Sequence, residues 1–197
     1  MISVADLDAL ATRTSLDHDE LRSELSEASA SGWVVADRGA LSGWSLTGEG
    51  RDELQRALRA ELDRTGAHSS VESAYQAFLL LNAPFLELCT AWQLRTGDDG
   101  EAVVNDHSDA AYDRTVIGRL EPIHVGVAEL LGDLTTALDR FGGYRPRFER
   151  AWERLADNDV DWFTRPLIDS YHTVWFELHE DLLATLGRTR SSEQRRS

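Results

Sequence analysis

Apolar residues recur at helical spacing along most of the chain, and only short stretches depart from that period. In the N-terminal third, the pattern predicts three helices: one over residues 4–12, one that Asp17 is placed to cap, and one over residues 48–64. The inward faces of the second and third helices carry, in chain order, Leu21, Leu25, Ala28, Leu54, Leu58 and Leu62.

A β-hairpin is predicted between the second and third of these helices. Residues 33–36 and 44–46 are short β-prone runs, and the turn-forming residues 37–39 lie between them. Gly32 is placed to end the preceding helix in a left-handed conformation, and Thr47 is placed to cap the next one.

From residue 66 onward the pattern is helical again. We expect Ser69 and Glu72 to form a capping box at the start of a helix that reaches Arg95, and Pro84 to kink that helix. Residues 98–107 are predicted to form a loop. Further helices are expected after the cap Ser108 to Leu120, from Pro122 to Phe141, from Pro146 to Ala156, and from Pro166 to about Gly187.

Together these elements predict a mostly α fold, with a winged helix-turn-helix module that contains one β-hairpin and is followed by an α-helical domain. We expect residues 1–65 to form the first module and residues 66–190 to form a helical bundle for dimerisation or ligand binding. The polar residues 191–197 are expected to be a disordered tail.

The first module resembles the winged-helix domain of MarR- and PadR-type bacterial regulators. Two segments carry the resemblance, Gly32-Trp33-Val34 and Leu46-Thr47-Gly48-Glu49-Gly50-Arg51. The resemblance implies a winged-helix fold and, by analogy, a DNA-binding regulator. Such domains have one more helix ahead of the helix-turn-helix pair, and Met1 leaves no room for it. We therefore expect the C-terminal helices or a second chain to cover that side.

The charge of the chain opposes strong binding to DNA. Its formal net charge is −15, and all 20 of its basic residues are arginine, with no lysine. A large negative field repels phosphate. The second predicted helix would be the recognition helix, yet its outward residues include Asp19, Glu20, Glu24 and Glu27. The candidates for contact with DNA are Arg13, His18, Arg22 and Arg38.

The C-terminal half carries a second resemblance, in residues 140–144 and 169–182. These segments are similar to parts of uncharacterised actinobacterial proteins, some of which are similar to extensions of phosphoenolpyruvate-utilising enzymes. The resemblance implies an accessory or interaction module and supplies no catalytic residues.

Histidine, tryptophan and carboxylate side chains in this half are candidates for a ligand site. His172 and His179 are seven residues apart and share a helical face, with Trp175 between them. The candidate ligand-binding residues are His107, His124, Trp162, Asp169, His172, Trp175 and His179. A metal sensor or enzyme at His172 and His179 and a purely structural role in the core are alternatives. Because the H-E-x-x-H spacing is absent, we expect no metal and no cofactor.

Several other classes are excluded by the sequence. The segment Gly43-Trp44-Ser45-Leu46-Thr47 lacks the final glycine of a nucleophile elbow, and no phosphate-binding loop is present, so we expect no enzyme. The single cysteine, Cys89, lies in an apolar run and is expected to be a buried thiol. With no membrane span and no signal peptide, the chain is expected to be cytoplasmic.

Two functions remain after these exclusions. The first is a homodimeric transcriptional regulator that binds DNA and a small-molecule effector. The alternative is a non-DNA-binding interaction or accessory module of a metabolic enzyme.

Overall fold

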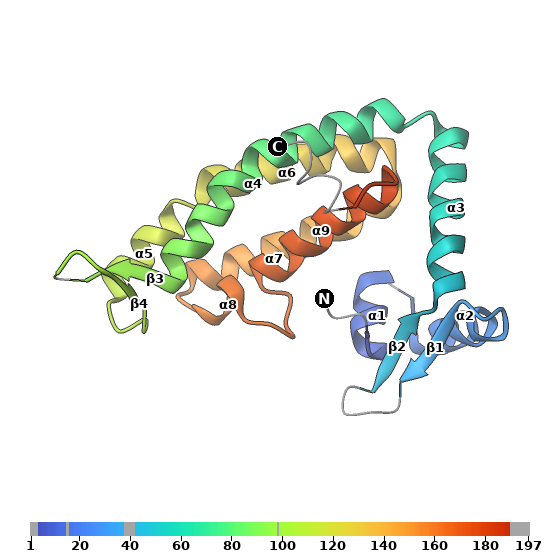
Figure 1. Cartoon of the computed structure of the whole chain (residues 1–197), viewed down its shortest axis with the longest axis horizontal. Helices are drawn as coiled ribbons and strands as arrows, with labels where there is room; N and C mark the ends of the chain where they lie inside the picture. Colours follow the sequence, from blue (N-terminus) through green and yellow to red (C-terminus); the bar gives the residue numbers. More distant parts are fainter. Residues whose placement is uncertain (1–3, 15, 38–41, 98, 190–197) are drawn as a thin grey trace. The chain divides into compact units, whose positions relative to one another are not determined.

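The computed structural model describes residues 4–14, 16–37, 42–97 and 99–189. The chain divides into two compact units, residues 1–64 and 65–197, and each is described by itself (Figure 1). The described residues are mostly helical, as predicted, but they contain two antiparallel hairpins rather than one. The division lies next to the boundary expected between residues 65 and 66. The expected tail, residues 191–197, lies outside the described residues.

The first helix, α1 (Leu7–Thr14), begins three residues later than predicted, because the segment ahead of it is extended. Ala5 forms an isolated antiparallel bridge with Trp44, in which each backbone N–H donates to the other carbonyl, at 2.9 and 2.8 Å. The Asp6 carboxylate then accepts from a backbone N–H in the first turn of α1, at 2.7 Å. The backbone groups at Ala5 therefore bond to the hairpin and not to a longer helix.

The second helix, α2 (His18–Ala30), begins where predicted, at the cap Asp17. The Asp17 carboxylate accepts from the backbone N–H groups of Asp19 and Glu20, both at 2.9 Å, and the Glu20 carboxylate accepts from the Asp17 N–H at 3.4 Å. This reciprocal pattern is a capping box. After the helix, Gly32 has a φ of +75°, which confirms the predicted left-handed helix end.

The hairpin pairs β1 (Val34–Asp37) with β2 (Gly43–Leu46) in antiparallel register. It leads into α3 (Gly48–Thr65), and Thr47 caps that helix as predicted. The Thr47 hydroxyl accepts from the N–H of Gly50 at 3.0 Å and donates to the carbonyl of Gly32 at 2.6 Å. One threonine thus joins the end of α2, the hairpin and the start of α3. The buried leucines of this unit are Leu21, Leu25, Leu58 and Leu62.

The elements of the second unit are, in chain order, α4 (His68–Gln93), β3 (Leu94–Thr96), β4 (Ala102–Val104), α5 (Ala110–Gly118), α6 (Glu121–Ala137), the 3₁₀ segment η1 (Asp139–Gly143), α7 (Tyr144–Ala156), α8 (Asp161–Thr164) and α9 (Tyr171–Thr185). Four of these helices contact one another in a closed ring: α4 packs on α6 and α9, and α7 packs on the same two helices. Of the other elements, α5, β3, β4 and α8 gather at one end of this ring (Figure 1), and η1 packs on α6 and α7.

Aromatic side chains fill the interior of this ring. Phe85 stacks on Trp175 with ring centroids 4.3 Å apart, and Trp92 stacks on Phe163 at 4.5 Å. The large aromatic residues that are buried here are Tyr75, Phe78, Phe85, Trp92, Phe141, Phe148, Phe163, Tyr171 and Trp175. Burial of such side chains is the main source of stability that the helices gain from packing.

The start of α4 differs from the prediction. No capping box forms, because Ser69 lies inside the helix and Ala67 precedes it without a side-chain hydrogen bond. The Glu72 carboxylate instead accepts two hydrogen bonds from the Arg188 guanidinium, at 2.7 and 3.1 Å. Glu72 therefore joins the start of α4 to the chain that follows α9. The helix continues through Pro84.

Other predicted boundaries are wrong by a few residues. Asp109, and not Ser108, caps α5, because the Ser108 hydroxyl donates to Asp106 instead. Ser170, and not Pro166, precedes the first turn of α9 and caps it. The helix expected to reach Phe141 ends at Ala137, and the chain continues as the separate 3₁₀ segment.

The second hairpin occupies much of the stretch that was predicted to be a loop. Leu94 pairs with Val104 and Thr96 with Ala102, so β3 continues directly from the end of α4. Gly100, in the turn, has a φ of +82°. Strands of three residues are too short to give an alternating pattern that sequence analysis can recognise.

Two smaller expectations concern burial and membranes. Cys89 is buried, as predicted, and burial raises the pKa of its thiol to about 12. Among the helices of the described residues, none combines the length and the apolar character that a membrane crossing requires.

Candidate functional site

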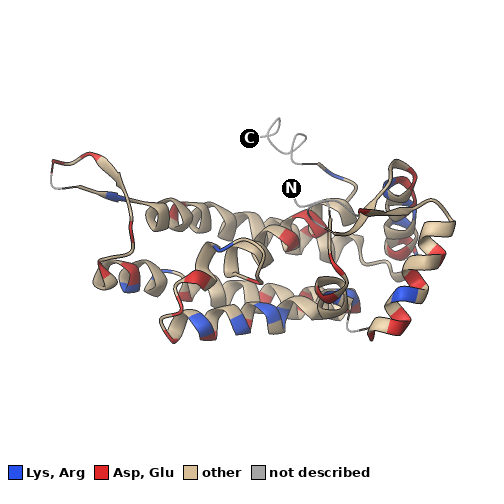
Figure 2. Cartoon of the chain, turned by 90° about the horizontal axis from the view of Figure 1, so that it is seen from below, with Lys and Arg blue, Asp and Glu red and all other residues tan. Residues whose placement is uncertain are grey.

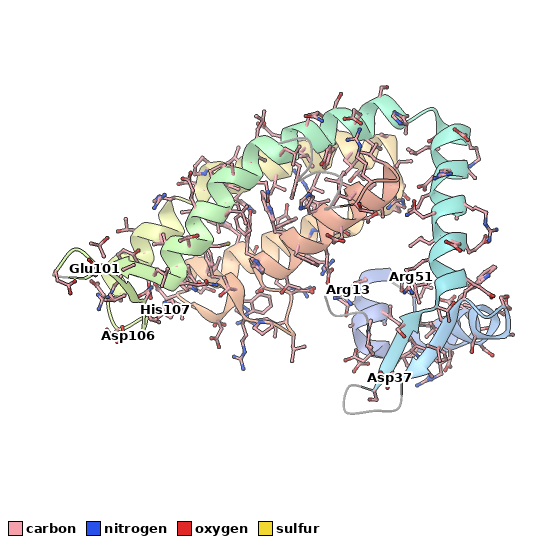
Figure 3. All side chains as sticks on the ribbon, viewed as in Figure 1. Arg13, Asp37, Arg51, Glu101, Asp106 and His107 are labelled. Carbon is pink, nitrogen blue, oxygen red and sulfur yellow. The ribbon has the colours of Figure 1, made fainter. Side chains whose placement is uncertain are left out.

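In the first unit, three of the four candidate DNA-binding residues are described, and all three are exposed. Arg13 lies in the last turn of α1 (Figure 3), while His18 and Arg22 lie one turn apart on α2. His18 Nε2 is 3.2 Å from an oxygen of Asp8, and Arg22 is 3.2 Å from Asp19. The fourth residue, Arg38, lies outside the described residues.

The exposed surface of α2 is strongly acidic. Its four carboxylate residues, Asp19, Glu20, Glu24 and Glu27, are all exposed, as the sequence predicted. Across both units, acidic positions outnumber basic ones along the ribbon (Figure 2). A groove lined with phosphates would meet this helix with repulsion as well as with the attraction of Arg22.

In the second unit, three of the candidate ligand-binding residues form one row on α9. His179 is only 6% exposed and packs on the Phe78 ring at 4.9 Å, and Trp175 donates from Nε1 to Asn82 at 2.9 Å. His172 faces Phe85, with ring centroids 6.3 Å apart. The structure therefore brings His172, Trp175 and His179 against the aromatic face of α4.

His124 lies in a separate place, between α6 and α7. Its ring stacks on Trp152 at 4.9 Å, and its Nδ1 is 3.4 Å from the Tyr171 hydroxyl. Burial lowers the pKa of His124 below its ordinary value of 6.5, although the charge of Glu149 acts in the opposite direction. The neutral imidazole is thus the favoured form at this position.

Asp169 and Trp162 are engaged by arginines from α7. Asp169 receives two hydrogen bonds from the buried Arg147, at 3.0 and 2.9 Å, and Arg147 also donates to Glu177 at 2.6 Å. Trp162 lies under the guanidinium of Arg154, which is 5.5 Å from the ring centroid. The candidate ligand residues are therefore spread over several clusters.

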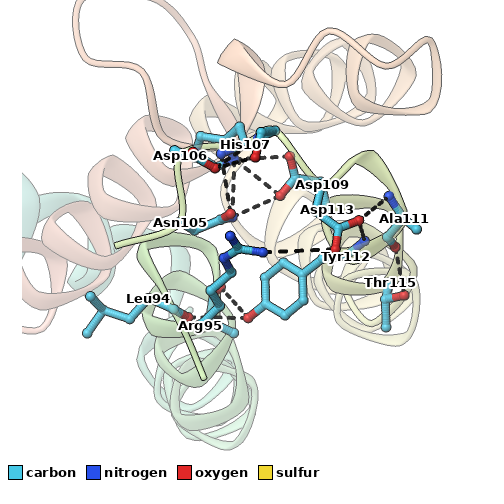
Figure 4. Close-up of polar contacts among 12 residues, drawn as sticks. Leu94, Arg95, Asn105, Asp106, His107, Asp109, Ala111, Tyr112, Asp113 and Thr115 are labelled. Atoms are coloured by element: carbon cyan, nitrogen blue, oxygen red, sulfur yellow. Dashed lines mark hydrogen bonds and ion pairs between the residues drawn. The ribbon is translucent and has the colours of Figure 1, made fainter. Parts of the chain in front are cut away.

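The remaining candidate, His107, belongs to a polar cluster where β4 leads into α5 (Figure 4). Its Nδ1 is 3.1 Å from Asp113, which is only 3% exposed, and its ring packs on Trp92 at 4.4 Å. The buried Asn105 amide donates to Asp113 at 2.9 Å and to the Trp92 carbonyl at 3.0 Å. Asp113 and the Trp92 ring thus fix the orientation of the imidazole.

The backbone at His107 has an unusual conformation. His107 has a φ of +59°, a conformation that residues other than glycine seldom adopt. Its backbone N–H donates to the Asn105 side chain at 3.3 Å, which helps to hold the turn. Sequence analysis selected His107 but missed Asn105 and Asp113, because one more carboxylate in an acidic chain gives no distinct signal.

Next to this cluster, Arg95, Asp109 and Tyr112 line a hollow of about 600 Å³ at the end of α4. The nearest oxygen of Asp109 is 4.0 Å from Arg95, and the buried Arg95 Nε has no hydrogen-bond partner. The Tyr112 hydroxyl donates to the Ala91 carbonyl at 2.8 Å. It is also 3.2 Å from the Leu94 carbonyl (Figure 4). Arg119 also lines this hollow, and sequence analysis selected neither arginine.

Within the part of the chain that the structure describes, no three His, Cys, Asp or Glu side chains are grouped so that they could hold a metal ion.

Comparison with known proteins identifies no relative: no family model, no curated protein and no solved structure matches the chain.

Proposed function

We propose that the chain is a winged-helix protein of the transcriptional-regulator type, whose first unit binds DNA and whose helical unit dimerises and binds a small-molecule effector. The observation that carries this proposal is the bridge between Ala5 and Trp44. It ties the segment ahead of α1 to the hairpin, so that two short helices and a wing-like hairpin share one module, with α3 leading out of it.

In this proposal α2 is the recognition helix, because the second helix of a helix-turn-helix enters the major groove. Arg22 and His18 lie on it, and Arg13 lies at the end of the preceding helix. The contacts of Arg22 with Asp19 and of His18 with Asp8 are surface pairs. Such pairs contribute about 0–1 kcal/mol, so phosphate oxygens can replace the carboxylates.

Fluorescence anisotropy with a 30-base-pair duplex tests this proposal. The full chain is expected to bind at 50 mM salt and to lose affinity as salt rises, because binding by phosphate contacts releases counterions. The double variant R13Q/R22Q is expected to weaken binding and to reduce the salt slope by about one for each lost phosphate contact. Arg150→Gln in the helical unit is the matched control. Absence of binding at 50 mM salt would overturn the proposal.

The acidic surface of α2 favours a second candidate, an interaction or accessory module that binds a basic protein surface instead of DNA. The variant E24Q/E27Q separates the two, with E149Q/E153Q on α7 as a control of equal charge. If α2 enters the groove, neutralising Glu24 and Glu27 raises DNA affinity by about tenfold or more. If α2 faces a protein, the variant still does not bind DNA.

The helical unit would supply the dimer and the effector response. A ligand that binds one arrangement of the dimer more tightly shifts the population towards it and so changes DNA affinity. α4 and α6 pack together and expose three large apolar side chains, Leu80, Leu86 and Val125. These residues are candidates for the dimer contact, because an interface would cover the apolar surface that each of them exposes.

A further inference from the structure

The hollow beside Arg95 has the size and the chemistry of a ligand pocket. Its volume of about 600 Å³ is within the range of roughly 300–1,000 Å³ that small-molecule sites occupy. Its lining includes two guanidinium groups, Arg95 and Arg119, and the hydroxyl of Tyr112. Two carboxylates, Glu87 and Asp109, also line it, so the four charged groups sum to zero.

The two arginines are less engaged than others of this unit. Arg147 and Arg188 hold carboxylates at 2.6 to 3.1 Å. By contrast, Arg95 reaches Asp109 only at 4.0 Å, and its Nε is buried without an acceptor. The Arg119 side chain makes no hydrogen bond or ion pair with any residue that the structure describes. Neither guanidinium is therefore held by a close carboxylate, and both can donate to a carboxylate supplied by a ligand.

A second, apolar hollow adjoins the first and shares Arg119 with it. Its volume is about 250 Å³. On α4, Pro84 and Leu88 of the second hollow and Ala91 of the first follow at steps of three or four residues and so share one face of the helix, and Arg95 follows in β3. Arg119 therefore lies where an apolar lining meets a polar one. The apolar side chains of the second hollow are Leu81, Pro84, Leu88, Pro122 and Ile123.

We infer that these two hollows form one binding site for a monocarboxylate with a short apolar chain. The carboxylate pairs with the guanidinium of Arg119, and with that of Arg95, in the geometry that arginine offers to carboxylates. The chain fills the apolar hollow. Glu87 and Asp109 also line the hollow, and their charges oppose a second negative charge on the ligand, so the site favours a monocarboxylate over a dicarboxylate. The inference names the effector class of the proposed regulator, and it rests on that proposal only for the effect on DNA.

Isothermal titration calorimetry of the full chain with sodium hexanoate tests the site without DNA. We expect hexanoate to bind and hexan-1-ol, which lacks the charge, to bind at least tenfold more weakly. Butyrate, which lacks two methylenes, is expected to bind about tenfold more weakly than hexanoate. Equal binding of hexanoate and hexan-1-ol would overturn the inference, as would the absence of hexanoate binding at 10 mM or equal binding of butyrate.

Variants then locate the site. Arg119→Gln and Arg95→Gln are each expected to weaken hexanoate binding about tenfold or more. Arg114→Gln removes an exposed arginine of α5 that does not line either hollow, and it should leave binding unchanged. Because Arg119 is exposed, its variant is expected to keep the thermal midpoint of the parent chain, which circular dichroism checks. Unchanged binding in R119Q contradicts the site.

The two proposals fail in different ways. If hexanoate binds but no DNA duplex binds at 50 mM salt, the regulator proposal is wrong and the ligand site remains. If DNA binds but hexanoate does not, the ligand site is wrong and the regulator proposal remains. If both bind, hexanoate is expected to change the DNA affinity of the parent chain and not that of R119Q.

Discussion

At the scale of single residues, Arg147 shows how this acidic chain uses an arginine that it buries. Burial alone would lower the pKa of the guanidinium, but hydrogen bonds and charge from Asp169 and Glu177 raise it above its ordinary value. The guanidinium of Arg147 therefore stays charged although it is buried. It joins α7 to the start and the middle of α9.

Loss of this guanidinium should be costly. We expect Arg147→Met to lower the free energy of unfolding by about 3–5 kcal/mol, because two partly buried carboxylates lose their partner. Arg145→Met, two residues away, removes an exposed guanidinium whose Nε is 3.9 Å from Glu149, and it should cost about 1 kcal/mol or less. Urea unfolding of both variants measures the difference. A loss below 1 kcal/mol in R147M would contradict the role assigned to it.

The lowered pKa of His124 leads to a second prediction at this scale, on how stability depends on pH. Because its pKa in the folded chain is lowered, the unfolded chain binds a proton more readily. The stability that neutral His124 contributes is complete above its ordinary value of about 6.5, and it is lost as the pH falls below that value.

Urea unfolding between pH 7.5 and 5 tests this dependence. We expect His124→Phe, which keeps a ring against Trp152, to lose stability less steeply over this interval than the parent chain. His68→Phe is the control, since His68 is exposed at the start of α4. If the free energy of unfolding depends on pH in the same way in the parent chain and in H124F, the pH dependence does not come from His124.

At the scale of elements, the contact between the hairpin and α3 depends on Gly50. A Cβ at this position would lie 1.9 Å from the carbonyl oxygen of Trp33, which is backbone and cannot turn aside. We expect Gly50→Ala to destabilise the first unit by about 1–3 kcal/mol or more. Gly48→Ala, two residues earlier, has open space around its Cβ and should be neutral or slightly stabilising.

Hydrogen exchange of the full chain checks this prediction separately for each unit. In G50A, exchange should accelerate at the amides that close the junction, including the Thr47 N–H that donates to Trp33. The amides of the helical unit should exchange as in the parent chain. Equal protection of these amides in G50A and G48A would show that the close approach of Gly50 to the Trp33 backbone is not needed for the stability of the first unit.

The same elements show which structural features could be predicted from the sequence. Asp17, Gly32 and Thr47 were predicted as helix signals, and all three act as such, because caps and left-handed turns depend on a few adjacent residues. Ser69 also matched a local signal, yet Glu72 pairs with Arg188, over a hundred residues away. Distant partners of this kind leave no local pattern.

The candidate site was predicted less completely than the helices, for the same reason. His107 was selected as one of the histidine, tryptophan and carboxylate residues of the C-terminal half, whereas Arg95 and Arg119 are two among 20 arginines. What sets them apart is that they line one hollow together, from β3 and from the end of α5, and that property depends on the tertiary structure. The bridge at Ala5 was missed because a single extended residue has no period.

At the scale of the whole molecule, the proposed dimer makes a testable contact prediction. Leu80 and Leu86 are 80% and 53% exposed on α4, and Leu167 is 75% exposed ahead of α9. If the outer side of α4 forms the interface, L80E/L86E is expected to be monomeric, while Leu167→Glu should remain dimeric. Light scattering after size exclusion measures both. A monomeric parent chain would contradict the dimer.

Salt separates this association from DNA binding, because the two respond in opposite directions. Each chain carries a net charge of −15, so two chains repel one another and screening favours the dimer. DNA binding by arginine and phosphate weakens over the same range. We therefore expect the dimer to tighten between 50 and 500 mM sodium chloride, measured by analytical ultracentrifugation, while DNA affinity falls. A dimer that weakens with salt would place charged pairs, and not the leucines of α4, at the interface.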